Sequence, residues 1–230
     1  MTVTGIVLAG GRSTRMGRDK ASLPFGTETL LQRAIRIVGE VTDEVVVVAR
    51  PGATSAPCGG GNPFLVHRSA TREGGLGLPV RVVHDPVADL GPLAGLAAGL
   101  SASTTELNIV VACDMPLIKP AVLRRLVELL GDAAICVAVV DGHASPLCAV
   151  YRSSVAGVAQ QLLGDGERRV MALLDRVQTK RVEAAMFRDL DPDLDSFVSC
   201  NTPEAYAAAL VRLTTSAKAT AVKKADATRS

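Results

Sequence analysis

The feature that most constrains this chain is a short apolar run at residues 6–9 (Ile-Val-Leu-Ala) that breaks abruptly into a loop rich in glycine and cations. Gly10 and Gly11 have no side chain and can adopt positive φ, so an anionic group can approach the backbone N–H groups of the loop closely. The pattern predicts a buried β-strand that ends in a polyphosphate-binding loop. The cations available to contact phosphate oxygens are Arg12, Arg15, Arg18 and Lys20.

Neither of the two common glycine-loop fingerprints fits this stretch. A Walker A loop carries lysine directly after its last glycine, whereas Gly17 is followed here by Arg18 and Asp19. A dinucleotide-binding fingerprint has the spacing G-x-G-x-x-G, but the glycines of this loop stand at positions 10, 11 and 17. These mismatches count against a kinase-like protein and against a dehydrogenase-like protein.

The composition of the chain limits its partners. Its 230 residues are enough for one α/β domain or two small ones, and with 48% hydrophobic but only 3% aromatic residues the core must be mainly aliphatic. A formal net charge of +2 is too small to argue for nucleic acid or an anionic membrane, so we expect neither as a partner. Basic charge is concentrated locally, in the glycine loop.

Cysteine usage and hydropathy indicate a cytoplasmic protein. The five cysteines include no C-x-x-C pair, and an odd number does not suit a disulfide framework. We expect no signal peptide before Gly5, and no apolar run approaches the ~20 residues that span a bilayer. We therefore expect reduced thiols at Cys58, Cys113, Cys136, Cys148 and Cys200.

Beyond the glycine loop, strand and helix patterns alternate, which predicts one α/β domain over residues 1–213. Thr29 and Gln32 have the spacing of a capping box at the start of the first helix. Residues 51–79 form a long loop insertion rich in small residues, and residues 214–230 lack an apolar stripe and predict a disordered tail. The other predicted strands are 44–49, 80–84, 108–112, 134–140, 147–151, 179–183 and 197–200, and the other predicted helices include 91–100, 120–130, 153–163 and 205–213.

Two aspartates stand at the ends of predicted strands, at the edge where a doubly wound sheet binds its ligands. Asp85 is one of them, and the helix after it opens near Pro92 at the same expected edge as the glycine loop. Asp114 is the other, and a carboxylate there is well placed to hold Mg²⁺, which prefers one or two carboxylates plus phosphate oxygens. Because aspartate and proline also favour turns, the alternative is that Asp114 only caps the turn before the helix at Pro120.

Two adjacent arginines, Arg168 and Arg169, stand at the predicted start of a further helix, where cations oppose the helix dipole. A bound phosphate group would compensate for them, and so would pairing with Asp165 or Glu167; the sequence leaves both explanations open. His143 lies in a polar turn between two predicted strands. It either contacts an acceptor substrate or is solvated.

The glycine loop also resembles the signature of nucleotidyltransferases that use a nucleoside triphosphate and release pyrophosphate, L-A-G-G-x-S-x-R-M-G-x-D-K. Residues 8–20 fill every fixed place of that pattern. With its later segments, the chain resembles the molybdenum cofactor guanylyltransferases, also called molybdopterin-guanine dinucleotide synthases, over nearly its whole length to about Leu213. Those segments are Asp85 with residues 91–95, then residues 113–116, 166–171 and 201–204.

The resemblance implies a single-domain, three-layer nucleotidyltransferase (Rossmann-like) fold of the α/β class with a mostly parallel central sheet. It also implies transfer of GMP from GTP to molybdopterin with release of pyrophosphate, Mg²⁺ as cofactor, and molybdoenzyme maturation proteins as further partners. The implied catalytic residues are Arg15, Lys20 and Asp114. Leu8, Ala9, Gly10 and Gly11 would line the nucleotide site, Arg15 and Lys20 would hold phosphates, Asp85 would fix the nucleoside, Asp114 would bind Mg²⁺, and Arg168, Arg169 and Asn201 would lie on the pterin side.

The sequence departs from the family pattern at three places. Ala49 and Arg50 occupy the region where the family usually carries an asparagine, Ser199 stands where a second asparagine is common, and the segment 51–79 is longer than the family needs. The nearest alternatives are a CTP-dependent molybdopterin cytidylyltransferase and a sugar-phosphate nucleotidyltransferase. A non-catalytic carrier of the finished cofactor is a different class, and the combination of Lys20 with Asp114 argues against it.

Overall fold

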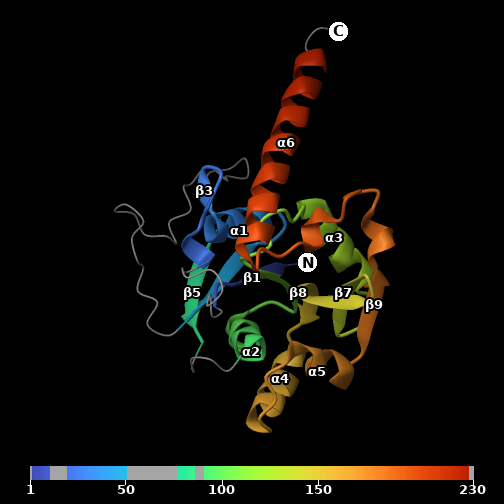
Figure 1. The fold of residues 1–230 in the computed structure, drawn as a ribbon. Helices are drawn as coiled ribbons and strands as arrows, with labels where there is room; N and C mark the ends of the chain where they lie inside the picture. The colour runs from blue at the N-terminus through green and yellow to red at the C-terminus, as the bar shows by residue number, and fades with distance from the viewer. Residues whose placement is uncertain (1, 11–19, 51–76, 86–90, 228–230) are drawn as a thin grey trace.

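The computed structural model describes residues 2–10, 20–50, 77–85 and 91–227. Within these ranges the main sheet consists of the strands β1 (Val3–Leu8), β4 (Glu44–Ala49), β5 (Val80–His84), β6 (Leu107–Ala112), β7 (Ile135–Val140), β8 (His143–Arg152) and β9 (Thr179–Glu183). Their order across the sheet is β5-β4-β1-β6-β8-β7-β9. Figure 1 shows helices on both faces of this sheet, so the predicted three-layer α/β arrangement is confirmed.

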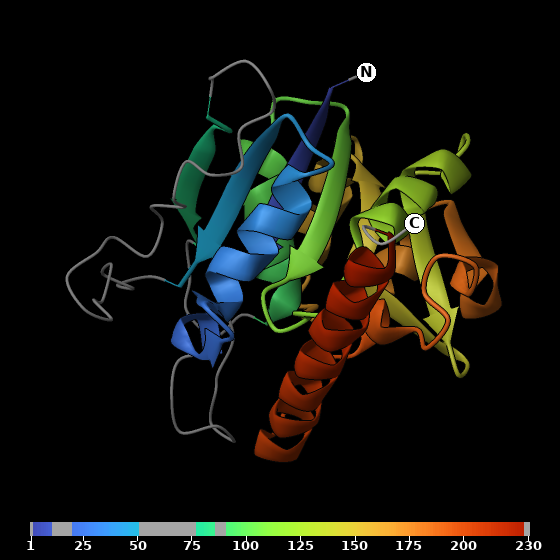
Figure 2. The ribbon, with the colours of Figure 1, turned by 90° about the horizontal axis from the view of Figure 1, so that it is seen from above.

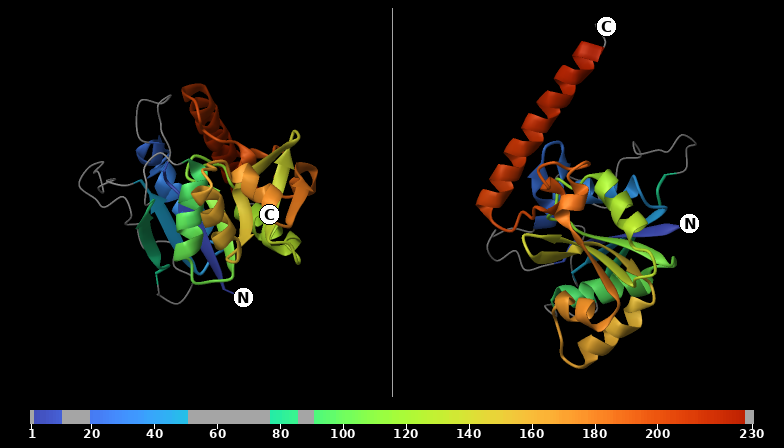
Figure 3. Two further views of the ribbon diagram at one scale, coloured as in Figure 1. Left: turned by 90° about the horizontal axis from the view of Figure 1, so that it is seen from below. Right: turned by 90° about the vertical axis from the view of Figure 1, so that its right-hand side faces the viewer.

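The helices are α1 (Leu30–Gly39), α2 (Pro92–Ala102), α3 (Pro120–Leu129), α4 (Val155–Gly164), α5 (Val170–Arg176) and α6 (Pro203–Ala227). Figures 2 and 3 show α1 and α3 on one side of the sheet and α2, α4 and α5 on the other. None of the helices in the described ranges combines the length and the apolar character of a membrane-spanning helix.

The sheet is mostly parallel, as predicted, and β8 is the exception. It pairs antiparallel with both β6 and β7. Asp141 and Gly142 join β7 to β8 with φ values of 49° and 76°, and two positive φ values are typical of the tight type I′ hairpin. The wider polar turn predicted over residues 141–146 is therefore wrong, because β8 already begins at His143.

The hydrophobic core lies on both faces of the sheet, since successive side chains of a strand point to opposite faces. In β1, Val7 packs in the cluster that contains α1 and α3, whereas Ile6 and Leu8 pack in the cluster that contains α2, α4 and α5. Small residues let α2 approach β1 closely, because a Cβ on Gly99 would lie only 2.5 Å from Ile6 Cγ2. The strand that leads into the glycine loop is thus held firmly on both sides.

The predicted capping box is confirmed at the start of α1. Thr29 Oγ1 accepts the Gln32 backbone N–H at 3.2 Å, and the Gln32 side chain accepts the Thr29 N–H at 2.9 Å. These two hydrogen bonds satisfy amide groups that otherwise lack a partner at a helix start. They fix where the chain turns into the helix after the glycine loop.

Two predictions near the C-terminus are wrong. Residues 197–200 do not form a strand: the 3₁₀ helix η3 (Asp195–Phe197) ends there, and the Cys200 N–H donates to the Asp114 carbonyl at 2.7 Å instead of joining the sheet. The tail predicted to be disordered from Thr214 is helical as far as Ala227, where α6 ends. Alanine and lysine are strong helix formers, and Figure 1 shows this part of α6 leaving the body of the molecule, so no apolar stripe is required.

Candidate active site

The carboxyl ends of β1, β4, β5 and β6 form one edge, because these strands are parallel and adjacent. Hydrogen bonds continue between the strands just beyond their ends. Ala9 N–H donates to the Val48 carbonyl, and Asp85 N–H donates to the Ala49 carbonyl, each at 2.9 Å. Residues 8–10 and Asp85, predicted to line the nucleotide site, therefore lie at the same edge of the sheet.

Lys20, Asp114 and Asn201 meet at this edge although they are far apart in the sequence. The Lys20 ammonium donates to Asn201 Oδ1 at 2.6 Å and lies 3.2 Å from Asp114 Oδ2. Asn201 Nδ2 donates in turn to Ser199 Oγ at 2.7 Å. The Lys20 and Asp114 side chains are each 17% exposed, so a ligand can reach them while partial burial strengthens their charge interactions.

Backbone contacts hold the three segments in register. Asp114 follows β6 in a turn, in which Met115 N–H donates to the Ala112 carbonyl at 3.3 Å. The hydrogen bond from Cys200 N–H to the Asp114 carbonyl brings the neighbouring Asn201 beside the Asp114 side chain. The backbone of Asp114 thus takes part in the turn, while its carboxylate faces Lys20. Asp114 therefore both shapes the turn and contributes its side chain to the site.

The three side chains combine one cation with two oxygen donors. Lys20 can bind phosphate oxygens as a point charge, and the carboxylate of Asp114 with the amide oxygen of Asn201 is the kind of donor set that Mg²⁺ prefers. In the part of the chain that the structure describes, no three His, Cys, Asp or Glu side chains are grouped as a metal site. A metal ion here would draw its other ligands from substrate and water.

Arg168 and Arg169 form a separate basic group in the connection between α4 and α5. The Glu167 carboxylate binds Arg169 at both oxygens, with distances of 2.8 Å to Nη2 and 3.1 Å to Nε. It also accepts the backbone N–H groups of Arg168 and Arg169 at 2.8 and 2.9 Å. Hydrogen bonds from the Arg169 side chain and from these N–H groups lower the pKa of Glu167 to about 2. Of the two explanations left open by the sequence, pairing with Glu167 is therefore observed.

The backbone of Arg168 lies against the N-terminus of α2. Gly91, the N-cap residue of α2, has φ of 79° and ψ of 179°, a conformation that is essentially limited to glycine. A Cβ at this position would stand 3.0 Å from the Arg168 carbonyl oxygen. Because α2 begins beyond the carboxyl end of β5, this contact fixes Arg168 near the edge that carries Asp85.

Some predicted site residues lie outside the described residues. They are Gly11, Arg12, Arg15 and Arg18 of the glycine loop, together with residues 51–76 of the predicted insertion. The last residues of that insertion, 77–79, have no regular secondary structure, and β5 starts at Val80 as predicted.

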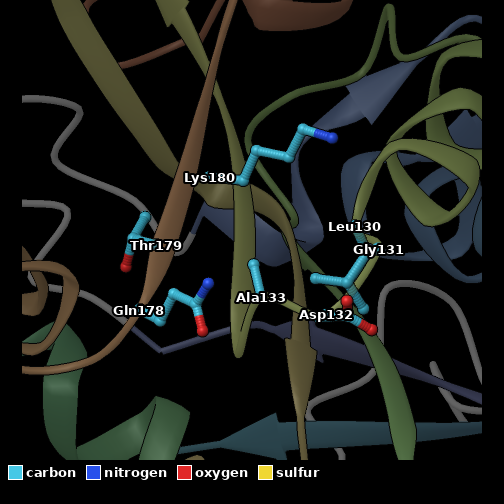
Figure 4. Close-up of a pocket in the computed structure, with 7 residues that line it drawn as sticks. All are labelled: Leu130, Gly131, Asp132, Ala133, Gln178, Thr179 and Lys180. Atoms are coloured by element: carbon cyan, nitrogen blue, oxygen red, sulfur yellow. The ribbon is translucent and has the colours of Figure 1, made fainter.

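His143 and a surface cavity are not connected to the Lys20 group by any contact in the described structure. The exposed His143 ring has Nδ1 2.8 Å from the Asp141 carbonyl oxygen, a local partner within the hairpin. A cavity of about 480 Å³ opens where β7 and β9 begin, at the opposite edge of the sheet. Its polar groups do not converge, because Figure 4 shows the Lys180 ammonium extending away from Asp132 and Gln178.

One support of the site is not predicted from the sequence. The hairpin of β2 (Pro24–Phe25) and β3 (Glu28–Thr29), which follows Lys20, packs on α6. Phe25 is fully buried there with Cys200 and Ala209. The signal that was available is Phe25 itself, a large aromatic residue in a short polar stretch of a chain with only 3% aromatic residues.

A parallel sheet whose glycine-rich loop is followed by a lysine facing an aspartate across the carboxyl edge is the framework of a nucleotidyltransferase. The model of the MobA-like NTP transferase domain matches residues 5–182. The chain belongs to this MobA-like NTP transferase family and is a nucleotidyltransferase.

Curated relatives have a more specific name. A probable molybdenum cofactor guanylyltransferase from Pelotomaculum thermopropionicum is 32% identical over 203 residues, which cover 88% of this chain and 89% of the relative. A protein of the same name from Mycobacterium tuberculosis is 36% identical over 197 residues, which cover 82% of this chain and 87% of the relative. The chain is thus a member of the molybdenum cofactor guanylyltransferases.

A solved structure supports the fold independently. The molybdopterin-guanine dinucleotide biosynthesis protein A from Archaeoglobus fulgidus superposes with a TM-score of 0.71 at 24% sequence identity. The match covers 92% of this chain and 99% of that one, so the two proteins share the architecture over most of this chain and nearly all of the other.

Proposed function

We propose that this enzyme transfers GMP from GTP to molybdopterin and releases pyrophosphate, which yields the molybdopterin guanine dinucleotide cofactor. The observation that carries the proposal is the meeting of Lys20, Asp114 and Asn201 at the carboxyl edge of the sheet. The names of relatives that are 32% and 36% identical over most of the chain support guanine over the other bases.

The reaction is a displacement at the α-phosphorus of GTP. An oxygen of the terminal phosphate of molybdopterin attacks that phosphorus, and the bond to the oxygen that bridges the α- and β-phosphates breaks, so pyrophosphate leaves. Both reactants are anionic, and in-line positioning and charge neutralisation are therefore the main tasks of the catalyst. The acceptor phosphate is already ionised near neutral pH, so no general base is needed.

We assign the nucleotide to the end of β1. The backbone of Leu8, Ala9, Gly10 and Gly11 would contact it, and Asp85 would bind the nucleoside part. Lys20 would neutralise phosphate oxygens, with Arg15 as a second cation. The partial burial of Lys20 favours this role, because a charge shielded from water interacts more strongly with a ligand.

We propose Asp114 as the protein carboxylate that holds Mg²⁺, with Asn201 Oδ1 as a second oxygen donor. These oxygens fit a cation, because both already converge on the Lys20 ammonium, at 3.2 and 2.6 Å. When bound, the ion would neutralise phosphate charge. Asp114 would orient it, and Lys20 would turn from Asp114 toward the phosphates.

We assign Arg168 and Arg169 to the acceptor side, where they would bind the phosphate of molybdopterin. The Arg169 side chain is 79% exposed, so its ion pair with Glu167 is a surface pair and contributes little stability by itself. An anionic ligand can therefore share or replace that partner. The contact between Arg168 and Gly91 supports a location of the two arginines near the carboxyl edge of the sheet, to which we assign the nucleotide.

We further propose that the enzyme works in the cytoplasm and passes its product to molybdoenzyme maturation proteins. The first part is supported by Cys113, Cys136, Cys148 and Cys200, which are buried and form no disulfide in the described part of the chain. Burial raises the pKa of Cys148 to about 12, which keeps this thiol protonated and inert.

The test is pyrophosphate release by the purified protein with Mg²⁺ and molybdopterin, compared among GTP, CTP, ATP and UTP. We expect clear preference for GTP. Preference for CTP would instead identify a cytidylyltransferase. Release with none of the four would contradict the proposal and favour a sugar-phosphate nucleotidyltransferase or a carrier protein.

A further inference from the structure

The segment that follows Lys20 packs both on the main core, through Ala21, and on the C-terminal helix, through the cluster around Phe25. Lys20 opens the 3₁₀ helix η1 (Lys20–Ser22), and the β2–β3 hairpin comes directly after it. Leu23 ties the two together, since its N–H donates to the Lys20 carbonyl at 3.0 Å and its carbonyl accepts the Leu30 N–H at 2.9 Å. A shift of the hairpin would therefore move Lys20.

A small hydrophobic cluster separate from the main core fixes the hairpin. Its buried members are Phe25 and Leu30 from the N-terminal part and Cys200 and Ala209 from the C-terminal part. The Tyr206 ring packs edge-on against Phe25, with centroids 6.2 Å apart and an interplanar angle of 62°. An edge-to-face pair of this kind contributes beyond simple burial.

Tyr206 also binds the backbone of the hairpin. Its hydroxyl donates to the Pro24 carbonyl, in a stretch where the chain has just left η1. Burial raises the pKa of Tyr206 above its usual value, so the hydroxyl remains protonated and remains a donor at neutral pH. The residue thus holds Phe25 through its ring and Pro24 through its hydroxyl.

The same C-terminal segment contacts Lys20 directly. Asn201, which precedes α6 closely, accepts the Lys20 ammonium at 2.6 Å. At the third turn of α6, Leu213 Cδ2 stands 3.2 Å from the position of a Cβ on Gly26, at the tip of the hairpin. Asn201 therefore holds the ammonium of Lys20, and the contacts between α6 and the β2–β3 hairpin fix the backbone of Lys20 indirectly.

We propose that Tyr206 is a positioning residue for Lys20, and that it sets the affinity for the triphosphate by fixing the Lys20–Phe25 segment on α6. Tyr206 acts through Lys20 and does not touch the substrate. The inference rests on the proposed function only in that Lys20 binds the triphosphate.

The test is a double-mutant cycle in the full chain, with calorimetric measurement of GTP affinity in the presence of Mg²⁺. Tyr206→Phe removes the hydroxyl and keeps the ring, and Lys20→Met removes the ammonium. We expect Tyr206→Phe to weaken GTP binding about three- to tenfold in the wild-type background, the range of one lost hydrogen bond. In the Lys20→Met background the same change should alter affinity by less than about twofold, because contacts that act through one group are not additive.

Val211→Ala is the matched control, since Val211 lies on the same helix with 64% exposure. It should leave the affinity for GTP unchanged. Equal losses from Tyr206→Phe in both backgrounds, or no loss in the wild-type background, would overturn the proposal. If the wild-type protein binds no nucleoside triphosphate at all, the proposed function itself has failed, which is a different outcome of the same measurement.

Discussion

Replacing Gly91 with alanine should destabilise the protein strongly for a change of one methyl group. At φ of 79° and ψ of 179° the backbone lies in a region that residues with a Cβ rarely adopt, and such a residue costs about 1–3 kcal/mol. The new Cβ would also stand 3.0 Å from the Arg168 carbonyl oxygen. That neighbour is backbone, which cannot rotate away as a flexible side chain can. We therefore expect the upper part of the range, about 2–3 kcal/mol.

The assay is urea unfolding followed by circular dichroism, with Gly157→Ala as the control. Gly157 lies exposed within α4, and an added Cβ there meets no atom of the described structure within 4 Å. Alanine is favoured over glycine in a helix by about 1 kcal/mol, so this variant should be slightly more stable than the wild type. If Gly91→Ala and Gly157→Ala unfold at the same urea concentration, the reasoning about Gly91 is refuted.

Gly91→Ala should also affect the acceptor side of the reaction more than the nucleotide side. The contact with Arg168 means that the backbone shift forced by the Cβ moves the basic group formed by Arg168 and Arg169. We expect the KM for molybdopterin to rise more than the KM for GTP. An equal rise of the two KM values would contradict a role of Arg168 and Arg169 in acceptor binding.

The remaining predictions concern the charged groups and the end of the chain. Lys20→Met should weaken GTP binding by about 1.5–3 kcal/mol, the range for a hydrogen bond to a charged group. If calorimetry shows an unchanged affinity for GTP, Lys20 does not bind the phosphates. Asp114→Asn should abolish Mg²⁺-dependent pyrophosphate release while the far-ultraviolet circular dichroism spectrum is preserved. Full activity of this variant would contradict the assignment of Asp114 as the carboxylate that holds Mg²⁺. The pKa of Glu167 is depressed to about 2, so the stability that its carboxylate contributes is complete above the ordinary glutamate pKa and is lost as pH falls toward 2. The difference in unfolding free energy between the wild type and Glu167→Gln should therefore shrink over that pH range. A difference that stays constant would contradict a contribution of the ion pair to stability. Removal of residues 214–230 should leave folding and activity nearly unchanged, because Leu213 is the last of the described side chains that pack in the cluster with Phe25. Loss of folding would contradict this prediction.

Local patterns made much of the fold predictable. The abrupt end of the apolar run before Gly10 and the Thr29–Gln32 spacing each depend on residues that are close in the sequence, and the β1 strand and the capping box follow from them. The same local reasoning failed at residues 141–146. There the polar composition suggested a wide turn, but the Asp141-Gly142 pair is enough to reverse the chain.

The contacts that assemble the site were harder to predict, because they join distant segments. Asp114 could be placed at the end of its strand, but its contact with the backbone of Cys200 depends on where η3 ends, which no local pattern reveals. The support of Lys20 by α6 was missed for the same reason. For the part of α6 that follows Leu213 the error was physical: the missing apolar stripe argues against packing on the protein core but does not exclude a helix.

The hydrogen bond between Lys20 and Asn201 joins residues that are 181 positions apart. Contacts of such separation form late in folding, because the entropy of closing a long loop must be offset before they stabilise the chain. A ribosome that has made the glycine loop must still add the 181 residues that lead to Asn201 before Lys20 can contact this partner. The enzyme therefore completes its charged centre only after Asn201 has been synthesised, and a message cut short before the codon for Asn201 yields a protein in which that centre cannot form.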